Sequence, residues 1–493
     1  MVYDSLGRKT AMGDPDMGYW QYGYDARGNL TSQLDAKNQT INFDYDALNR
    51  LADKRYPDGS TANYYYDAGT YGKGQRTSMS NISGNTSWQF DARGRTTQAA
   101  YTVNGLGTRT FNYTFDAADR VKTISYPGIM TGGETPISEV VTYNYDVAGH
   151  QASLCTTLQA NCYIQSATYS ALNQPIARQS GNSTQQNWIY SGPMQRLFQL
   201  TVGPNSTPNQ YLSRNYAYDS VGNVNVIGDN TICQQQNFQY DEQNRLTRAA
   251  TQDNCGQTRP DDYTQNVSYD QVGNITTKTG VGTYSYNNGH AHQVSQVGST
   301  PISYDANGNA NNGPNHIFNW NVDNQLASSS NQNDTEAYSY DADGERVART
   351  SWVGSTTTTT YSVGGGMWEE DSNGTIRELY SFGGSVVAQR TYTPAPPRLP
   401  LRLVVVVPLP RVPQPPNRLT RCHLPQPLPY HLPLRPCRPP TRPYHRLIRL
   451  LVLPPRLRPI ARRTLSAFLR VKLAVPRLRV GLIVATQRLR WQR

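Results

Sequence analysis

The stretch GYDARGNLTS, residues 23–32, has near-copies along most of this chain. The Asp that follows the aromatic residue recurs at Asp4, Asp25, Asp46 and Asp67, at a constant interval of 21 residues, and later copies follow at looser spacing. Self-similarity at a period of about 20 to 50 residues is typical of arrays in which each unit packs against its neighbours. The chain is therefore expected to be a repeat protein.

Each copy of the repeat predicts a β-hairpin. Aromatic and polar residues alternate before the Asp, as at Phe43 and Tyr45, so both rings lie on one face of a strand. The Asp can accept hydrogen bonds from the backbone just ahead, and a Gly or Asn three residues later supplies the left-handed conformation that closes a type I turn. The expected turn residues are Asp4 and Gly7, Asp25 and Gly28, Asp46 and Asn49, Asp91 and Gly94, Asp146 and Gly149, Asp219 and Gly222, Asp241 and Asn244, Asp270 and Gly273, Asp305 and Gly308, and Asp341 and Gly344.

The charge divides the chain in two. Residues 395–493 carry 21 of the 46 Lys and Arg and none of the 35 Asp and Glu, so the other 25 bases and 35 acids give residues 1–394 a formal charge of −10. The body, residues 1–394, is rich in Tyr, Asn, Gly, Thr and Ser, and shows no sustained helical spacing. We expect an all-β body of stacked antiparallel hairpins, followed by a separate basic tail.

An acidic, Tyr-rich β-surface does not suit nucleic acid, because binding to phosphate requires clustered Lys and Arg. Contact with sugars or polypeptide suits it better, since Tyr offers a flat apolar face and a hydroxyl. The alternative is that the Tyr rings only stack along the sheet as cross-strand pairs.

Nothing in the sequence suggests a membrane span or a signal peptide. No segment approaches the roughly 20 apolar residues that a span needs, and the N-terminus has no basic start followed by an apolar run. The chain opens inside a repeat, so we expect its natural start to lie upstream.

Two pairs of Cys can meet across hairpins. Cys155 and Cys162 flank a short connection, and Cys233 and Cys255 flank the hairpin that turns at Asp241. We expect both pairs to form disulfides, which fits an exported protein. The alternative is unpaired, buried Cys in a cytosolic protein.

A search for catalytic or metal-binding constellations fails. Gly69–Gly74 (GTYGKG) lacks the spacing and the hydroxyl residue of a phosphate-binding loop. His290 and His292 would share a strand face without further ligands, Asp341–Glu345 lacks the remaining oxygens of a calcium loop, and Glu369–Asp371 is a solvated acidic cluster. We expect no enzyme activity, no cofactor and no metal.

The repeats YDARGNLT (24–31), YDALNRLAD (45–53), FDARGRTTQ (90–98) and YDEQNRLTRA (240–249) resemble the YD repeats of the bacterial RHS family, which is related to wall-associated proteins and to teneurins. The resemblance covers about residues 1–392. It implies a large β-sheet that spirals into a hollow shell, secreted or displayed on the cell surface, which in RHS toxins encloses a C-terminal effector. The family's Arg-Tyr-Tyr-Asp-Pro signature and Asp-Pro-x-Gly cleavage site are missing, so no autoprotease residue is assigned.

The tail, residues 395–493, is dense in Pro, Arg and Leu. It has three interpretations: a basic effector domain, an extended Pro-rich linker, or a shifted reading frame of a GC-rich gene. Because the change of composition is abrupt and precedes the expected end of the shell, the sequence favours the shifted frame, with a disordered tail.

Two functions remain. The first is a non-enzymatic shell segment that encloses an effector polypeptide of a polymorphic toxin used in contact-dependent competition. The second is an adhesin of the wall-associated kind that binds cell-surface glycans.

Overall fold

Every regular element that the structure describes is a β-strand. The computed structural model describes residues 1–130, 136–160, 162–253, 262–286 and 289–394, and the chain divides into two units, Met1–Ala395 and Pro396–Arg493. Predictions about the tail therefore fall outside the described residues. The all-β prediction for the body is confirmed, and in the described part of the chain there is no helix long and apolar enough to cross a membrane.

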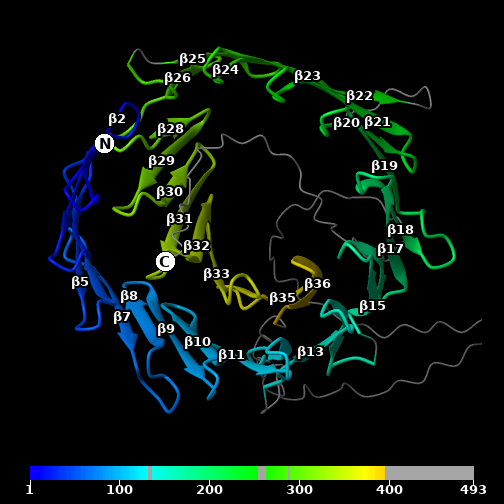
Figure 1. Ribbon diagram of the computed structural model, residues 1–493, viewed down its shortest axis with the longest axis horizontal. Coiled ribbons are helices and arrows are strands. Elements are labelled where there is room, and N and C mark those ends of the chain that lie inside the picture. Colours follow the sequence, from blue (N-terminus) through cyan, green and yellow to red (C-terminus); the bar gives the residue numbers. More distant parts are fainter. Residues whose placement is uncertain (131–135, 161, 254–261, 287–288, 395–493) are drawn as a thin grey trace, which may run out of the picture. The chain divides into compact units, whose positions relative to one another are not determined.

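The strands form two consecutive series, which we call the first and the second circuit (Figure 1). The first circuit consists of β1 (Val2–Tyr3), β2 (Lys9–Asp14), β3 (Gly18–Tyr24), β4 (Leu30–Leu34), β5 (Thr40–Tyr45), β6 (Leu51–Arg55), β7 (Thr61–Tyr66), β8 (Arg76–Asn81), β9 (Gly84–Phe90), β10 (Thr96–Val103), β11 (Gly107–Phe115), β12 (Val121–Ser125), β13 (Val140–Tyr145), β14 (Gln151–Thr156), β15 (Ile164–Tyr169), β16 (Pro175–Ser180), β17 (Thr184–Ser191), β18 (Arg196–Pro204), β19 (Leu212–Tyr218), β20 (Val224–Asp229), β21 (Gln234–Tyr240), β22 (Leu246–Asp253), β23 (Thr264–Tyr269), β24 (Ile275–Lys278), β25 (Gly282–Tyr286), β26 (Val294–Val297) and β27 (Thr300–Pro301). The second circuit consists of β28 (Asn312–Gly313), β29 (His316–Trp320), β30 (Leu326–Ser330), β31 (Asp334–Tyr340), β32 (Arg346–Val353), β33 (Thr356–Val363), β34 (Trp368–Asp371), β35 (Ile376–Phe382) and β36 (Ser385–Tyr392).

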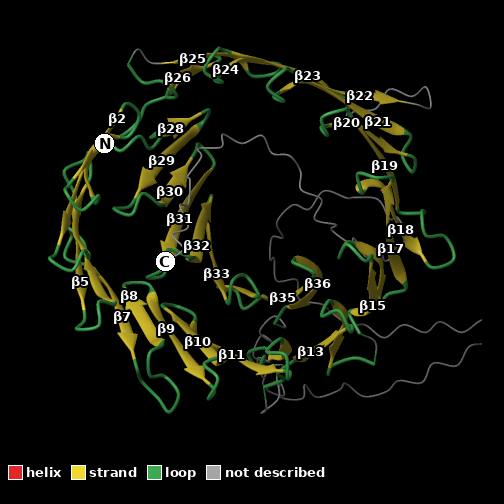
Figure 2. Cartoon of the chain, in the orientation of Figure 1, coloured by secondary structure: helices red, strands yellow, loops and turns green. Residues whose placement is uncertain are grey.

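Within each circuit, a strand pairs antiparallel with the strand before it and the strand after it, as in a continuous meander (Figure 2). The alternation of aromatic and polar residues favours strands, and each Asp-x-x-Gly turn reverses the chain within four residues. Because every connection is local, the sheet grows one hairpin at a time in sequence order.

The second circuit returns to lie against the first. The bonds between the circuits join residues that are 232 to 278 positions apart in the sequence. They begin at Asn307 with Asp35, continue at Tyr64 with Ala342, and end at Gly383 with Gln151. In Figure 1 the strands β28–β36 lie within the curve of the first circuit. One turn of this spiral therefore takes about 270 residues.

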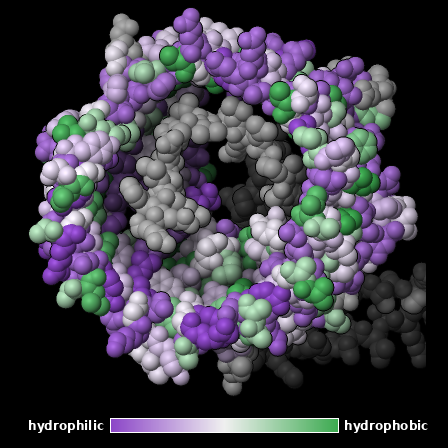
Figure 3. Space-filling model, viewed as in Figure 1, coloured by the Kyte–Doolittle hydropathy of each residue, from purple (hydrophilic) through white to green (hydrophobic). Residues whose placement is uncertain are grey.

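The main hydrophobic core lies between the two circuits. From the first circuit, strands β10–β15 contribute fully buried side chains such as Phe111, Val141 and Leu154. From the second, β34 and β35 contribute Trp368 and Tyr380. Neither sheet alone covers its apolar face, so the docking of the second circuit completes the core. On the view of Figure 3, hydrophilic and hydrophobic residues are interspersed.

Candidate functional site

The turns that follow the aromatic-Asp pairs, here called YD turns, share one geometry. In the turn Asp46–Asn49, the N–H of Asn49 donates to the carbonyl of Asp46 at 3.0 Å, and the N–H of Asp46 donates to the carbonyl of Arg50 at 2.9 Å. The Asp46 carboxylate accepts the backbone N–H groups of Leu48 and Arg50, both at 2.9 Å. These bonds describe a type I turn followed by a bulge, which shifts the register after Asp44.

The structure places all of the expected turn pairs at such turns. The N–H of the Gly or Asn donates to the carbonyl of the Asp at 2.9 to 3.3 Å in every case. Their φ angles lie between 60° and 108°, in or beside the left-handed region that favours Gly and Asn. The residues are Gly7, Gly28, Asn49, Gly94, Gly149, Gly222, Asn244, Gly273, Gly308 and Gly344.

The residue directly after the turn, its fifth position, links the turn to the next one. At Arg50, Nε donates to Asp46 Oδ2 at 2.7 Å, and the two Nη atoms donate to Asp67 of the following turn at 3.0 and 2.6 Å. The same guanidinium stacks over the ring of Tyr66 at 4.3 Å. Related contacts with the turn Asp or the next aromatic ring involve Arg8, Asn29, Arg95, Arg120, His150, Arg196, Asn223, Arg245, Asn274 and Asn309.

The Tyr before the turn Asp provides a second link between hairpins. The hydroxyl of Tyr66 donates to the carbonyl of Leu51, the first strand residue after the preceding turn, at 2.9 Å. The same bond recurs, at 2.7 to 2.9 Å, from Tyr24, Tyr145, Tyr169, Tyr218, Tyr240, Tyr269, Tyr286 and Tyr340. These hydroxyls are thus engaged with the main chain of the sheet itself.

The carboxylates of the YD turns respond to these contacts. Backbone N–H donation by Arg50 holds the pKa of Asp46 below its usual value, and the Arg50 guanidinium lowers the pKa of Asp67 to about 2. At Asp341, in the second circuit, burial raises the pKa instead. Its fifth position is Glu345, which offers no cation to the carboxylate.

The YD turns of the second circuit contact the first circuit. Lys37 Nζ lies 3.3 Å from Asp305 Oδ2, and Asn307 Nδ2 donates to Asp35 Oδ2 at 2.7 Å. A Cβ at Gly308 would lie 2.4 Å from the carbonyl oxygen of Asp16, so only Gly fits this approach.

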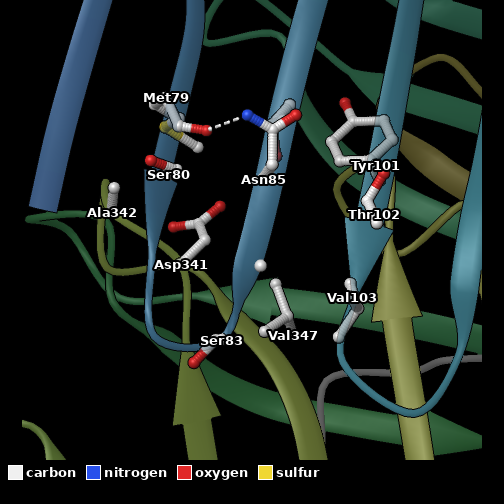
Figure 4. Close-up of a pocket in the computed structure, with 12 residues that line it drawn as sticks. Met79, Ser80, Ser83, Asn85, Tyr101, Thr102, Val103, Asp341, Ala342 and Val347 are labelled. Carbon is white, nitrogen blue, oxygen red and sulfur yellow. Dashed lines mark hydrogen bonds between the residues drawn. The ribbon is translucent and has the colours of Figure 1, made fainter.

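The YD turn Asp341–Gly344 also contacts the first circuit, on the face of β7–β9. The hydroxyl of Tyr64 donates to the carbonyl of Ala342 at 2.6 Å, and Arg76 pairs with Asp343. Figure 4 shows Asp341 and Ala342 beside Met79, in a cavity of about 10 Å³. That volume holds about one water molecule, so the docked turn nearly fills the space beside Met79.

The Tyr residues that precede the turn Asp, here called the YD Tyr residues, lie on one face of the sheet. The residue type on this face changes from apolar to polar along the first circuit. Five residues before the turn Asp, the strands that the second circuit covers carry apolar residues, such as Ile41, Ala62, Phe111 and Val141, with Thr86 as the exception. At the same position, strands after β15 carry Gln186, Arg214, Gln236 and Gln265. Among the described residues, the core clusters that include side chains of the second circuit contain none from these later strands.

Two other motifs of the sequence have structural partners. His292 Nδ1 lies 2.8 Å from Asn274 Oδ1, and Arg377 pairs with Glu369 and Asp371 at 2.7 to 2.8 Å. Among the residues that the structure describes, no group of His, Cys, Asp and Glu could hold a metal ion.

Cys155 and Cys162 form a disulfide across the connection between β14 and β15. Cys233 is also disulfide-bonded. Its expected partner, Cys255, lies outside the described residues, so this pairing stays a prediction.

Reasoning from the sequence missed the role of the fifth position and the return of the second circuit. A signal for the first was present, because that position holds Arg, Asn, His or Gln, all of them donors, in most repeats. The change from apolar residues to Gln five positions before the Asp was a signal for the second.

Comparisons with known proteins agree with this architecture. The family model named RHS Repeat matches residues 24–61. Toxin subunit YenC1 of Yersinia entomophaga is 25% identical over 261 residues, which cover 42% of this chain and 26% of that protein. This chain therefore matches about a quarter of the length of that relative.

Solved structures share the fold. The crystal structure of TcdB2-TccC3 without its hypervariable C-terminal region has a TM-score of 0.65 at 18% identity, over 80% of this chain and 23% of that one. The Photorhabdus luminescens Tc holotoxin pore has a TM-score of 0.61 at 18% identity, over 78% of this chain and 23% of that one. The motif within the RHS Repeat match at residues 24–61 recurs in the YD turns along the chain, and these solved structures share its fold.

Proposed function

We propose that this chain is a wall segment of a hollow, non-enzymatic shell that encloses the effector polypeptide of a secreted toxin. The proposal rests on the change from apolar to polar residues along the sheet face that carries the YD Tyr residues. Where the second circuit covers this face it is apolar, as at Phe111 and Val141, and beyond that region the same position holds Gln186 and Gln236. A face lined by Gln and Arg suits water or a polar polypeptide.

The similarity to a toxin subunit supports the same function. The links between neighbouring YD turns add a mechanical reason, because in most described repeats a donor side chain or a Tyr hydroxyl fastens one hairpin to the next. Such a wall is stiff along its whole length, as a container requires.

The alternative is a glycan-binding adhesin, in which the ring faces and hydroxyls of Tyr would contact the sugar. The YD Tyr residues donate their hydroxyls to backbone carbonyls, as Tyr66 does to Leu51, which counts against a sugar platform made of these residues. The basic tail, residues 395–493, belongs on this account to neither function, and we propose that it is out-of-frame sequence.

Small-angle X-ray scattering of the full chain, together with a glycan array, tests the proposal. A shell wall predicts a distance distribution shifted toward long distances, as hollow particles give, and no glycan binding above background. A filled particle that binds defined glycans would contradict the shell and support the adhesin. Brief trypsin treatment is expected to remove the tail at its many Arg residues and leave a fragment that ends near Tyr392.

A further inference from the structure

Two glutamates are buried together where the circuits meet. Glu139, just before β13 in the first circuit, is 0% exposed, and Glu378, on β35 in the second circuit, is 1% exposed. They are 239 positions apart in the sequence, so only the return of the chain brings them together. Two carboxylates without water are costly to bury unless charge and hydrogen bonds compensate them.

The hydroxyl of Tyr380 lies between the two carboxylates. Its oxygen is 2.5 Å from Glu139 Oε2 and 2.9 Å from Glu378 Oε2. A hydroxyl has one proton, so Tyr380 can donate to only one of these oxygens. The second contact is a hydrogen bond only if the other carboxyl carries a proton of its own.

The remaining partners decide which carboxyl is protonated. Glu139 Oε1 accepts the hydroxyls of Thr156 and of Tyr163, the latter at 2.8 Å, so Glu139 has the donors that a carboxylate needs. Glu378 Oε1 is buried and has no hydrogen-bond partner among the described residues. A neutral carboxyl tolerates such a position better than a carboxylate.

The charge balance leads to the same conclusion. Arg390 Nη1 lies 3.4 Å from both Glu139 Oε2 and Glu378 Oε2, and it is the one cation that contacts the pair within the described part of the chain. One Arg neutralises one carboxylate. The other groups that face the pair are the phenols of Tyr163 and Tyr380, which are neutral, and Tyr126, whose hydroxyl donates to the carbonyl of Leu379.

We propose that Glu139 and Glu378 bind one proton between them, held on Glu378 and bonded to Tyr380, and that this proton clamps the second circuit onto the first. When the proton leaves, two carboxylates face one Arg in a buried site, and the interface between the circuits weakens. Burial, and then the charge of Glu139, raise the pKa of Glu378 to about 7, which agrees with this arrangement. The clamp is thus closed in mildly acidic surroundings and loosened above neutral pH.

The sign of the pH dependence follows from linkage. A carboxyl whose pKa rises from 4.5 in the unfolded chain to about 7 in the folded protein stabilises the fold fully below 4.5. That contribution is lost as the pH rises through about 7. His150, whose pKa is raised by its bond to Asp146, and Asp341, whose pKa is raised by burial, change stability in the same direction, so the test must separate Glu378 from both.

The test compares urea unfolding of the full chain, as wild type and as Glu378→Gln, across this pH range. Gln has the shape of the protonated acid and can donate to Tyr380, so the variant is expected to keep a constant urea midpoint where the wild-type midpoint falls, apart from the shares of His150 and Asp341 that both proteins retain. Glu369→Gln, which removes a carboxylate from the partly exposed pair with Arg377, serves as the matched control and should keep the wild-type profile. A Glu378→Gln profile that parallels the wild type would overturn the proposal.

A measurement on the wild type alone keeps the proposal testable if the variant does not fold. The infrared band of a protonated carboxylic acid should persist above pH 5 and disappear as the pH rises through about 7. If no such band exists in mildly acidic solution, Glu378 holds no proton and the clamp is excluded.

Discussion

The two halves of the first circuit are built from the same repeat but differ at one position. In the covered half, strands such as β5, β11 and β13 place Ile41, Phe111 and Val141 against the second circuit, whereas β17 and β21 place Gln186 and Gln236 on the same face. The YD turn, the Tyr and the fifth-position donor are common to both halves. The repeat therefore fixes the hairpin and its neighbours, and the residue five positions before the Asp decides whether the face meets protein or solvent.

Exchanging the residues at this position should give the largest effect. Val141 is fully buried, so Val141→Gln introduces an amide without partners into the core and should lower the free energy of unfolding by about 3 kcal/mol or more. The reverse change in the uncovered half, Gln236→Val, should stay within about 0.5 kcal/mol. Chemical denaturation measures both changes in the free energy of unfolding. Equal losses would show that the second circuit does not cover one half and leave the other uncovered.

The glycines of the YD turns allow two kinds of turn to be compared. Docked turns contact the other circuit, and free turns do not. Gly308→Val should cost about 3 kcal/mol, because the left-handed conformation disfavours a branched residue by about 1 to 2 kcal/mol and its side chain would also clash with the backbone of Asp16. At Gly28 a Cβ meets nothing within 4 Å, so Gly28→Val should cost only about 1 to 2 kcal/mol. The same range is expected for Gly94→Val. If Gly308→Val lost no more stability than Gly28→Val, the contact between the Gly308 turn and Asp16 would be contradicted.

The hairpins and the turn residues were predictable, because the Asp, the Gly and the alternation of aromatic residues act within a few positions of each other. The docking of Gly308 on Asp16 was not, because it depends on the small rotations between hairpins, summed over some 290 residues. The buried pair of Glu139 and Glu378 was equally hidden, since each Glu looks ordinary in its own repeat.

The Tyr hydroxyls that link neighbouring hairpins have a smaller effect each. Tyr66→Phe removes the bond to the carbonyl of Leu51 and should cost about 1 kcal/mol. Its neighbour Tyr65 points to the other face and is 51% exposed, so Tyr65→Phe should leave stability unchanged. Thermal unfolding of the two variants distinguishes a link between hairpins from simple ring stacking, for which both changes would be equally mild.

The ion pair between the circuits should give the smallest effect. A double-mutant cycle on Arg76 and Asp343, which are each about a third exposed, should show a coupling of about 0.5 to 1 kcal/mol. The pair of Arg93 and Asp119, which joins two free turns at the surface, is the control and should show no measurable coupling. A coupling for the control that matched the first pair would remove the distinction between docked and free turns.

The return of the second circuit onto the first is the central claim, and a zero-length cross-link tests it most directly. Lys37 Nζ lies 3.3 Å from Asp305 Oδ2, although 268 residues separate the two in sequence. Treatment of the dilute full chain with a carbodiimide should join them by an amide bond, found by mass spectrometry as a peptide that contains both residues. Lys37→Arg, which keeps the charge but cannot form the amide, should abolish that peptide. If Lys37 of the folded chain joins only carboxylates of its own hairpins and never Asp305, the circuits do not meet and the account fails.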